Sequence, residues 1–263
     1  MTLAPLSDFD IGAVAAIAIA LLAYRARSLD LGGALAAVAV GTATFGALGL
    51  PGAGVLLAFF VTSVGLSRIG KERKAVALRD VGKTGPRDAA QVLANGGIAA
   101  LCALLTLWEG PRYAAAFAGA LAAATADTWG TEIGALAKGV PRSVLTFRPV
   151  ATGLSGGVTL QGNLAEIGGA LAIALCALAL VPHAFVAIWL GGMAGALADS
   201  LLGASLQSLR WCGACRRATE REPHACGANT TPLRGLSWFG NDATNYAATL
   251  VGATVAFALA GPR

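Results

Sequence analysis

The feature that most limits how this chain can fold is a series of apolar segments separated by polar connections. The longer segments reach the roughly 20 apolar residues that a helix needs to cross ~30 Å of hydrocarbon. Only 13% of the 263 residues are charged, against about 25% in soluble domains. Since a helix satisfies its backbone hydrogen bonds internally, the sequence predicts an all-α, polytopic transmembrane helical bundle that forms one integral membrane domain, 1–263.

The apolar segments predict about eight spans, and tight turns at Pro51 and Pro182 separate two pairs of them. The chain contains 35 glycines, and small residues allow transmembrane helices to pack closely. The predicted spans are Phe9–Tyr24, Leu31–Leu50, Ala53–Ser67, Ala89–Leu107, Tyr113–Ala137, Asn163–Val181, Ala184–Leu206 and Ala243–Ala260.

The basic residues predict the orientation, because cytoplasmic loops are enriched in Lys and Arg. With the N-terminus outside, the inside connections hold 17 of the 19 basic residues, and only Arg112 and Arg263 lie elsewhere. We therefore expect a multi-pass protein of the cell (inner) membrane whose long connections, and any active face, are cytoplasmic. The net charge of +5 is assigned to orientation rather than to nucleic-acid binding. The 17 residues are Arg25, Arg27, Arg68, Lys71, Arg73, Lys74, Arg79, Lys83, Arg87, Lys138, Arg142, Arg148, Arg210, Arg216, Arg217, Arg221 and Arg234.

Acidic residues inside predicted spans are the strongest functional signal. Asp127 and Glu132 lie in the fifth span, and Asp199 lies in the seventh. Charged side chains are costly within a membrane and usually face a polar interior that carries function. Asp127 and Glu132 are about 140° apart around an ideal helix, so they share a face only if the helix bends, as Gly130 would permit. We expect the three carboxylates to be catalytic and to bind Mg²⁺, a cation that prefers oxygen ligands; the alternative is interhelical hydrogen bonding.

A Gly-rich connection between the two acidic spans is a candidate phosphate-binding loop. Backbone N–H groups that Gly exposes, together with hydroxyls, bind anions, although the connection lacks the GKS/T of a P-loop. Arg142 and Arg148 precede it and could pair with phosphate. A flexible re-entrant connection is the alternative. The loop residues concerned are Thr152, Gly153, Ser155, Gly156 and Gly157.

Polar residues also mark the beginning of the fourth and eighth spans. Arg87, Gln91 and Asn95 recur every four residues and share one helix face, which indicates either nucleotide or phosphate binding or a hydrogen-bonded packing seam. The basic run from Lys71 to Lys83 is interpreted as a topology and lipid-binding signal, except that Lys83 adjoins this polar face and is a candidate phosphate ligand.

The eighth span begins with Asn241, Asp242 and Asn245, which are candidate Mg²⁺ or ribose ligands or, alternatively, an N-cap.

The last long connection contains four residues of a possible zinc site. Cys212, Cys215, His224 and Cys226 form the pattern C-x2-C-x8-H-x-C. Three thiolates and one imidazole would fill a tetrahedral structural site and leave no open position. Cytoplasmic thiols stay reduced, which argues against disulfides at this place.

In their order along the chain, these motifs resemble an integral membrane family that includes the chloroplast phytyl-phosphate kinase. The resemblance rests on Ala126–Gly134, Thr152–Val158, Gln91–Gly96 and the Cys/His loop that leads into Asn241-Asp242. It implies a nucleotide-dependent kinase, with CTP as the expected donor, that converts an isoprenoid monophosphate, such as phytyl or geranylgeranyl phosphate, to the diphosphate. The implied partners are CTP or another nucleoside triphosphate, an isoprenoid phosphate, Mg²⁺ and membrane lipid.

Two other functions fit the same residues. A lipid-phosphate cytidylyltransferase needs the same Mg²⁺ and phosphate contacts but releases pyrophosphate. A membrane transporter also uses intramembrane acids, often on repeated helices, although here the polar residues crowd one membrane face rather than the midplane.

Overall fold

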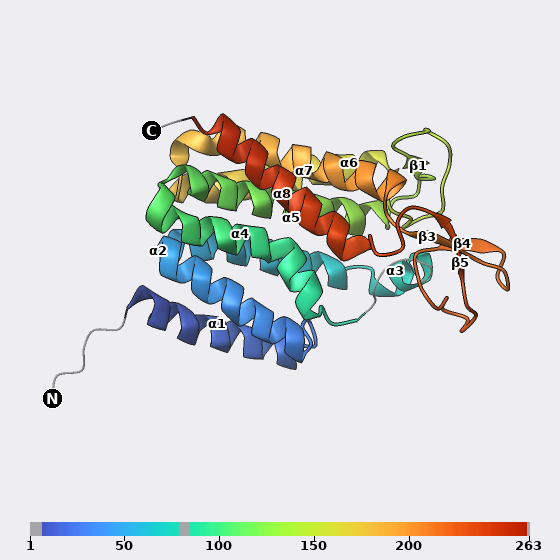
Figure 1. Cartoon of the computed structure of the whole chain (residues 1–263), viewed down its shortest axis with the longest axis horizontal. Coiled ribbons are helices and arrows are strands. Elements are labelled where there is room, and N and C mark those ends of the chain that lie inside the picture. Colours follow the sequence, from blue (N-terminus) through green and yellow to red (C-terminus); the bar gives the residue numbers. More distant parts are fainter. Residues whose placement is uncertain (1–6, 79–84, 262–263) are drawn as a thin grey trace.

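The computed structural model describes residues 7–78 and 85–261. This part of the chain forms long helices that run side by side, with short strands gathered at one end (Figure 1). The helices are α1 (Asp8–Arg25), α2 (Leu31–Arg68), α3 (Lys71–Ala77), α4 (Ala89–Glu109), α5 (Arg112–Gly134), α6 (Leu160–Cys176), α7 (Phe185–Ser205) and α8 (Asn241–Leu259), with 3₁₀ turns at Ala177–Ala179 and Pro182–Ala184.

The long helices coincide with the segments predicted from the apolar pattern, except that the second and third differ, and the short helix α3 lies outside every predicted span. The second and third predicted segments form a single element, α2, which is interrupted at Gly49, where φ is +58° and ψ is −153°. The left-handed region favours Gly because it has no Cβ, so the chain reverses at Gly49 and Pro51 begins the returning limb. The break therefore lies just before the predicted turn.

Four helical segments in the described part of the chain have the length and apolarity to cross a membrane. They are Leu31–Arg68, Ala89–Glu109, Leu160–Ala179 and Pro182–Ser205. α1 carries Asp8, Asp10 and Arg25 within its 18 residues, and α5 is rich in Ala and Thr and is surrounded by protein. A mostly helical membrane protein is confirmed, although short strands also form two small sheets in the described residues, and eight crossings and an outside N-terminus stay predictions.

α5 is the central helix of the bundle and packs against α2, α4, α6, α7 and α8. Nearly every residue from Ala114 to Ala126 is buried, and most of them are Ala. Small residues bring the backbones together: a Cβ added to Gly119 would lie 2.6 Å from the carbonyl oxygen of Gly252 on α8. Close contact of this kind is how helices associate where lipid offers no hydrophobic driving force.

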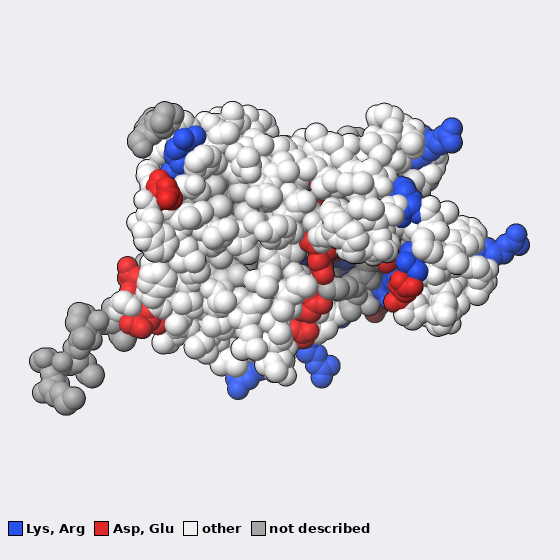
Figure 2. Space-filling model, viewed as in Figure 1, with Lys and Arg blue, Asp and Glu red and all other residues white. Residues whose placement is uncertain are grey.

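The connections predicted to be long lie together at one end of the bundle, which we call the strand end (Figure 1). It contains α3 and two antiparallel sheets, one of β1 with β2 and one in the order β4-β3-β5. Figure 2 shows Lys and Arg concentrated toward this end, with a largely uncharged surface along the helices. The strands are β1 (Arg142–Ser143), β2 (Gly157–Val158), β3 (Leu209–Cys212), β4 (Arg217–Thr219) and β5 (Thr231–Arg234).

Candidate functional site

The structure brings Asp127 of α5 and Asp199 of α7 together near the strand end. Their carboxyl groups share a hydrogen bond. Asn245 of α8 completes this contact, because its amide N–H₂ donates to Asp199 Oδ2 at 3.2 Å and to the Asn241 carbonyl at 3.3 Å. Two ionised carboxylates cannot share a hydrogen bond, so the pair needs a proton or a cation between its oxygens.

Glu166 on α6 is a third member of this carboxylate cluster that sequence reasoning missed. Its charge interacts with both Asp127 and Asp199. Its side chain lies over Gly130, where an added Cβ would stand 2.7 Å from Glu166 Oε1. The signal was present, since Glu166 is an acid within the apolar segment Asn163–Val181 and the rule that singled out Asp127 applies to it equally.

Glu132 faces a different neighbour from Asp127. α5 stays helical through Gly134 and does not bend at Gly130, so Gly130 provides room for Glu166 instead. The carboxylate of Glu132 pairs with Lys74 of α3, with Nζ and Oε2 2.5 Å apart. Its assignment as a Mg²⁺ ligand stays a prediction.

Lys74 corrects one interpretation of the basic run. Its side chain is 5% exposed, and its ammonium also donates to the carbonyl of Leu66 at 2.6 Å. A buried Lys with two internal acceptors fixes α3 to the bundle rather than binding lipid headgroups.

Arg87 lies at the entrance to α4 and its backbone is fixed by the connection after α1. Its N–H donates to the carbonyl of Ser28 and its carbonyl accepts from Asp30, both at 3.0 Å. Burial lowers the pKa of the Arg87 guanidinium from its ordinary value, and the nearby charge of Glu132 opposes this shift. The backbone contacts therefore hold Arg87 where its guanidinium interacts with the charge of Glu132.

Gln91 and Asn95 follow Arg87 on α4 and make hydrogen bonds within the helix. Gln91 forms a capping box with Asp88, whose backbone N–H donates to Gln91 Oε1 at 3.1 Å. The Asn95 amide donates to the carbonyl of Gln91 at 2.9 Å. These contacts match the packing alternative, and both side chains also border an apolar cavity together with Arg87.

The Gly-rich connection contacts the carboxylate of Glu220, a residue that sequence reasoning also missed. The Ser155 N–H donates to Glu220 Oε1 at 2.8 Å, and Gln207 donates to Glu220 Oε2 at 2.9 Å. Burial raises the pKa of Glu220, whereas the Ser155 and Gln207 hydrogen bonds and the charge of Arg234 lower it. The donor predicted for phosphate is thus engaged by an internal anion, and Glu220 also acts electrostatically on Asp199.

The other residues of this connection are placed around that contact. Gly153 and Gly156 have φ values of +88° and +77°, and Gly157 pairs with Ser143 between β2 and β1. Thr152 is half-buried. The loop therefore has the backbone conformation that only Gly adopts freely, as expected from its composition.

Arg142 and Arg148 are exposed, and the contacts of Arg142 remain within its own loop. The Arg142 guanidinium donates to the carbonyl of Phe147 at 2.8 Å. Lys83 lies outside the described residues. The phosphate-binding role of these three residues stays a prediction.

α8 begins at Asn241, and its N-cap is Gly240 without a side-chain cap. Asn241 and Asp242 therefore lie in the first turn rather than at the N-cap position itself. Of this group, Asn245 is the residue that reaches the carboxylate cluster.

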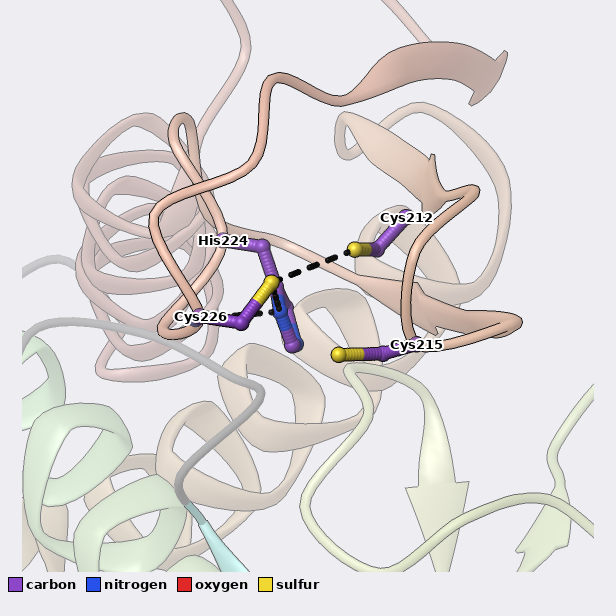
Figure 3. A group of neighbouring side chains, drawn as sticks. All are labelled: Cys212, Cys215, His224 and Cys226. Atoms are coloured by element: carbon purple, nitrogen blue, oxygen red, sulfur yellow. Dashed lines mark hydrogen bonds between the residues drawn. The ribbon is translucent and has the colours of Figure 1, made fainter.

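Cys212, Cys215, His224 and Cys226 converge at the strand end (Figure 3). Their sulfur and ring nitrogen atoms all lie within 4.8 Å of one another. The Cys212 and Cys226 sulfurs are 3.7 Å apart, and Cys226 Sγ lies 3.1 Å from His224 Nδ1. Ligands about 2.3 Å from a tetrahedral zinc have sulfurs about 3.8 Å apart, so this donor set fits the ion.

The fold and the buried acids define a polytopic integral membrane protein with a carboxylate cluster toward one end of its helices. The chain belongs to the family described as "Integral membrane protein DUF92", which matches residues 14–253. The resemblance to an integral membrane family is thereby confirmed.

Three relatives show how far the similarity extends. Protein PGR of Arabidopsis thaliana is 29% identical over 262 residues, which cover 89% of each chain. The uncharacterized membrane protein MJ0933 of Methanocaldococcus jannaschii is 33% identical, over 71% of this chain and 78% of its own. The uncharacterized membrane protein sll0875 of Synechocystis is 30% identical, over 59% of this chain and 62% of its own. No solved structure gives a significant match.

Proposed function

We propose that the protein is a nucleotide-dependent kinase that converts an isoprenoid monophosphate to the diphosphate, with CTP as the expected donor. The observation that carries this proposal is the convergence of Asp127, Glu166 and Asp199 from three helices. The membrane family supports an acceptor that is itself a lipid. We expect the strand end to face the cytoplasm, where soluble nucleotide is available.

The carboxylate cluster suits Mg²⁺. It offers oxygen donors alone, and its like charges disfavour full ionisation unless a cation lies nearby. Asp127 and Asp199, whose carboxyl groups contact each other, would hold the ion, with the charge of Glu166 nearby and Glu132 as a further predicted ligand. Bound Mg²⁺ would supply charge neutralisation at the phosphates.

The reaction needs little from the protein beyond position and charge. An acceptor phosphate oxygen forms a bond to the γ-phosphorus, the bond from that phosphorus to the β,γ-bridging oxygen breaks, and the nucleoside diphosphate leaves. The acceptor oxygen is already anionic at neutral pH, so no strong general base is required. Catalysis then depends on alignment and electrostatic stabilisation.

Nucleotide contacts would come from the strand end. The Gly-rich loop, Arg142, Arg148 and Lys83 are the proposed phosphate ligands, and Asn241 and Asp242 lie beside Asn245 at the start of α8. The hydrogen bond from the Ser155 N–H to Glu220 gives the loop a defined conformation before a nucleotide binds. A triphosphate would then compete with Glu220 for this N–H.

The Cys/His group would hold a structural Zn²⁺. β3 supplies Cys212, and the chain between β4 and β5 supplies His224 and Cys226. Because Glu220 lies just after β4, an ion at this place would stabilise the segment that engages Ser155.

The decisive experiment uses purified protein in lipid nanodiscs with Mg²⁺, geranylgeranyl monophosphate and CTP or ATP labelled at the γ-phosphate. Label that enters the lipid as a diphosphate supports the kinase. Labelled pyrophosphate would show a cytidylyltransferase instead. Absence of turnover with every nucleotide and with phytyl phosphate as well would overturn both enzyme proposals and favour transport.

A further inference from the structure

An apolar cavity of about 270 Å³ lies between α1, α2 and α4. Its lining runs along α1 from Gly12 to Ala23, which corresponds to about 16 Å of helix. Apolar side chains from both limbs of α2 complete the wall, and Leu50 and Ala53 stand beside the break at Gly49. The cavity is therefore elongated along the bundle and ends near the turn of α2.

The polar groups of the described lining are confined to the other end. They are Arg87, Gln91 and Asn95, from the connection before α4 and its first two turns. Arg87 is the one basic residue of this lining. An elongated apolar cavity with one cation at its mouth matches a single-chain amphiphile that has an anionic head.

The volume also limits the occupant. A dry cavity of roughly 150 Å³ holds benzene, so about 270 Å³ accommodates roughly a dozen carbons of a single chain. The remainder of a longer chain would continue between the helices into lipid. α1 is well exposed along its outer side, with Val14 66% and Leu22 65% exposed, so the cavity lies close to the lipid surface.

We propose that this tail cavity binds the isoprenoid chain of the acceptor, with its monophosphate at Arg87. This inference rests on the proposed kinase function and adds the acceptor subsite to it. The guanidinium of Arg87 interacts with the charge of Glu132 on α5, and Glu132 in turn interacts with that of Asp127. A phosphate at the mouth would therefore lie on the side of the carboxylate cluster, where a γ-phosphate would be transferred.

A variant that shortens the cavity tests this placement through chain-length preference. Ala53→Phe adds a ring at the deep end, and Ala18→Phe is the matched control, because Ala18 lies on the exposed side of α1. We expect Ala53→Phe to lower kcat/KM for geranylgeranyl phosphate at least tenfold while geranyl phosphate stays within twofold. The control should change neither value. Equal losses for both substrates in Ala53→Phe would overturn the placement.

A binding experiment without nucleotide separates the subsite from the chemistry. A geranyl monophosphate that carries a diazirine at the end of its chain is photolysed with the protein in nanodiscs, and labelled peptides are sequenced. Label should fall on residues 41–57 of α2 or on α1, and unlabelled geranylgeranyl monophosphate should displace it. Label on α6 or α7, or equal displacement by phosphatidic acid, would overturn the inference.

Arg87 is tested in the same assay. Arg87→Gln should raise the Kd of geranylgeranyl monophosphate at least tenfold and leave that of geranylgeraniol within twofold. For the monophosphate, the Kd of Arg87→Lys should lie between those of the unsubstituted protein and Arg87→Gln. An unchanged Kd for the phosphate would overturn the role of Arg87. Label in the cavity without any turnover would support the lipid-binding cavity and reject the kinase function. Turnover with label elsewhere would support the kinase function and reject the cavity as the acceptor site.

Discussion

The two halves of the bundle differ in whether open space remains between their helices. Around α5, glycine and alanine bring backbones into direct contact, so that a Cβ on Gly252 would lie 2.6 Å from the carbonyl of Gly119. Between α1, α2 and α4, by contrast, an elongated apolar cavity remains, and Ala53 of α2 is among the residues that line it.

The difference separates two tasks. The tight half carries Asp127, Glu166 and Asp199, whose like charges stay close only if the backbones beneath them cannot move apart. The loose half has space for an apolar chain and one cation at its mouth. Under the proposed function, the closely packed helices around α5 would keep the carboxylates in a fixed arrangement. The cavity between α1, α2 and α4 would accept apolar chains of different length.

The largest effect is expected where the tight half is forced open. Gly252→Leu places a side chain where the α5 backbone stands, and overpacking costs about 3 kcal/mol or more, which corresponds to roughly 10 °C in Tm. Ala53→Leu, which enlarges a side chain that lines the cavity in the other half, should leave Tm within about 2 °C. Thermal unfolding followed by circular dichroism in detergent measures both. Equal Tm values for the two variants would contradict the contrast.

The next largest effect concerns the charge that the tight half holds. Asp127→Asn preserves the shape and a hydrogen bond to Asp199 but removes a charge, so turnover should fall about 10²–10³-fold. Stability should be unchanged or higher, because one member of a like-charge cluster is gone. Turnover and Tm are measured on the same preparation. Intact phosphoryl transfer would remove Asp127 from the mechanism.

A moderate effect is expected from the strand end, which lies outside both halves. Cys215→Ser should abolish stoichiometric zinc, measured by mass spectrometry of the metal, and should lower turnover about tenfold because Glu220 loses its support. Cys102→Ser, within α4, is the control and should keep the zinc. If the unsubstituted protein is purified without bound zinc, the Cys/His group is not a zinc site.

The smallest net effect is expected from a paired change between α3 and α5. Glu132→Gln alone leaves Lys74 buried without its carboxylate, which costs about 3–5 kcal/mol. Lys74→Met with Glu132→Gln should recover most of that stability, and turnover should stay within about threefold of the starting protein if Glu132 acts only as the partner of Lys74. Recovered stability without recovered turnover would assign Glu132 to the metal.

The apolar pattern predicted the long helices to within a few residues because burial in lipid or protein imposes this pattern directly. The break in α2 moved to Gly49 because left-handed backbone, rather than Pro51, sets the reversal. Asp127 and Asp199 could be found because charge within an apolar run is rare, and Glu166 could have been found in the same way.

Glu220 and Lys74 were beyond sequence reasoning for a different reason. A charged residue in a polar connection looks like a solvated one, and only the folded contacts show that Glu220 accepts from Ser155 and that Lys74 is buried. The tail cavity was equally hidden, because empty space between three helices has no counterpart in the order of residues.

The alanine run of α5 has a consequence for motion. An alanine side chain has no rotamers to lose, so burying the many alanines of this helix on every side costs little side-chain entropy. Three residues beside Asp127 on α5, Ala123, Ala124 and Ala126, likewise have no alternative side-chain conformations, because they are fixed once their backbone is fixed. On this side of Asp127 the carboxylate cluster therefore lies against a surface that moves only when the whole helix moves.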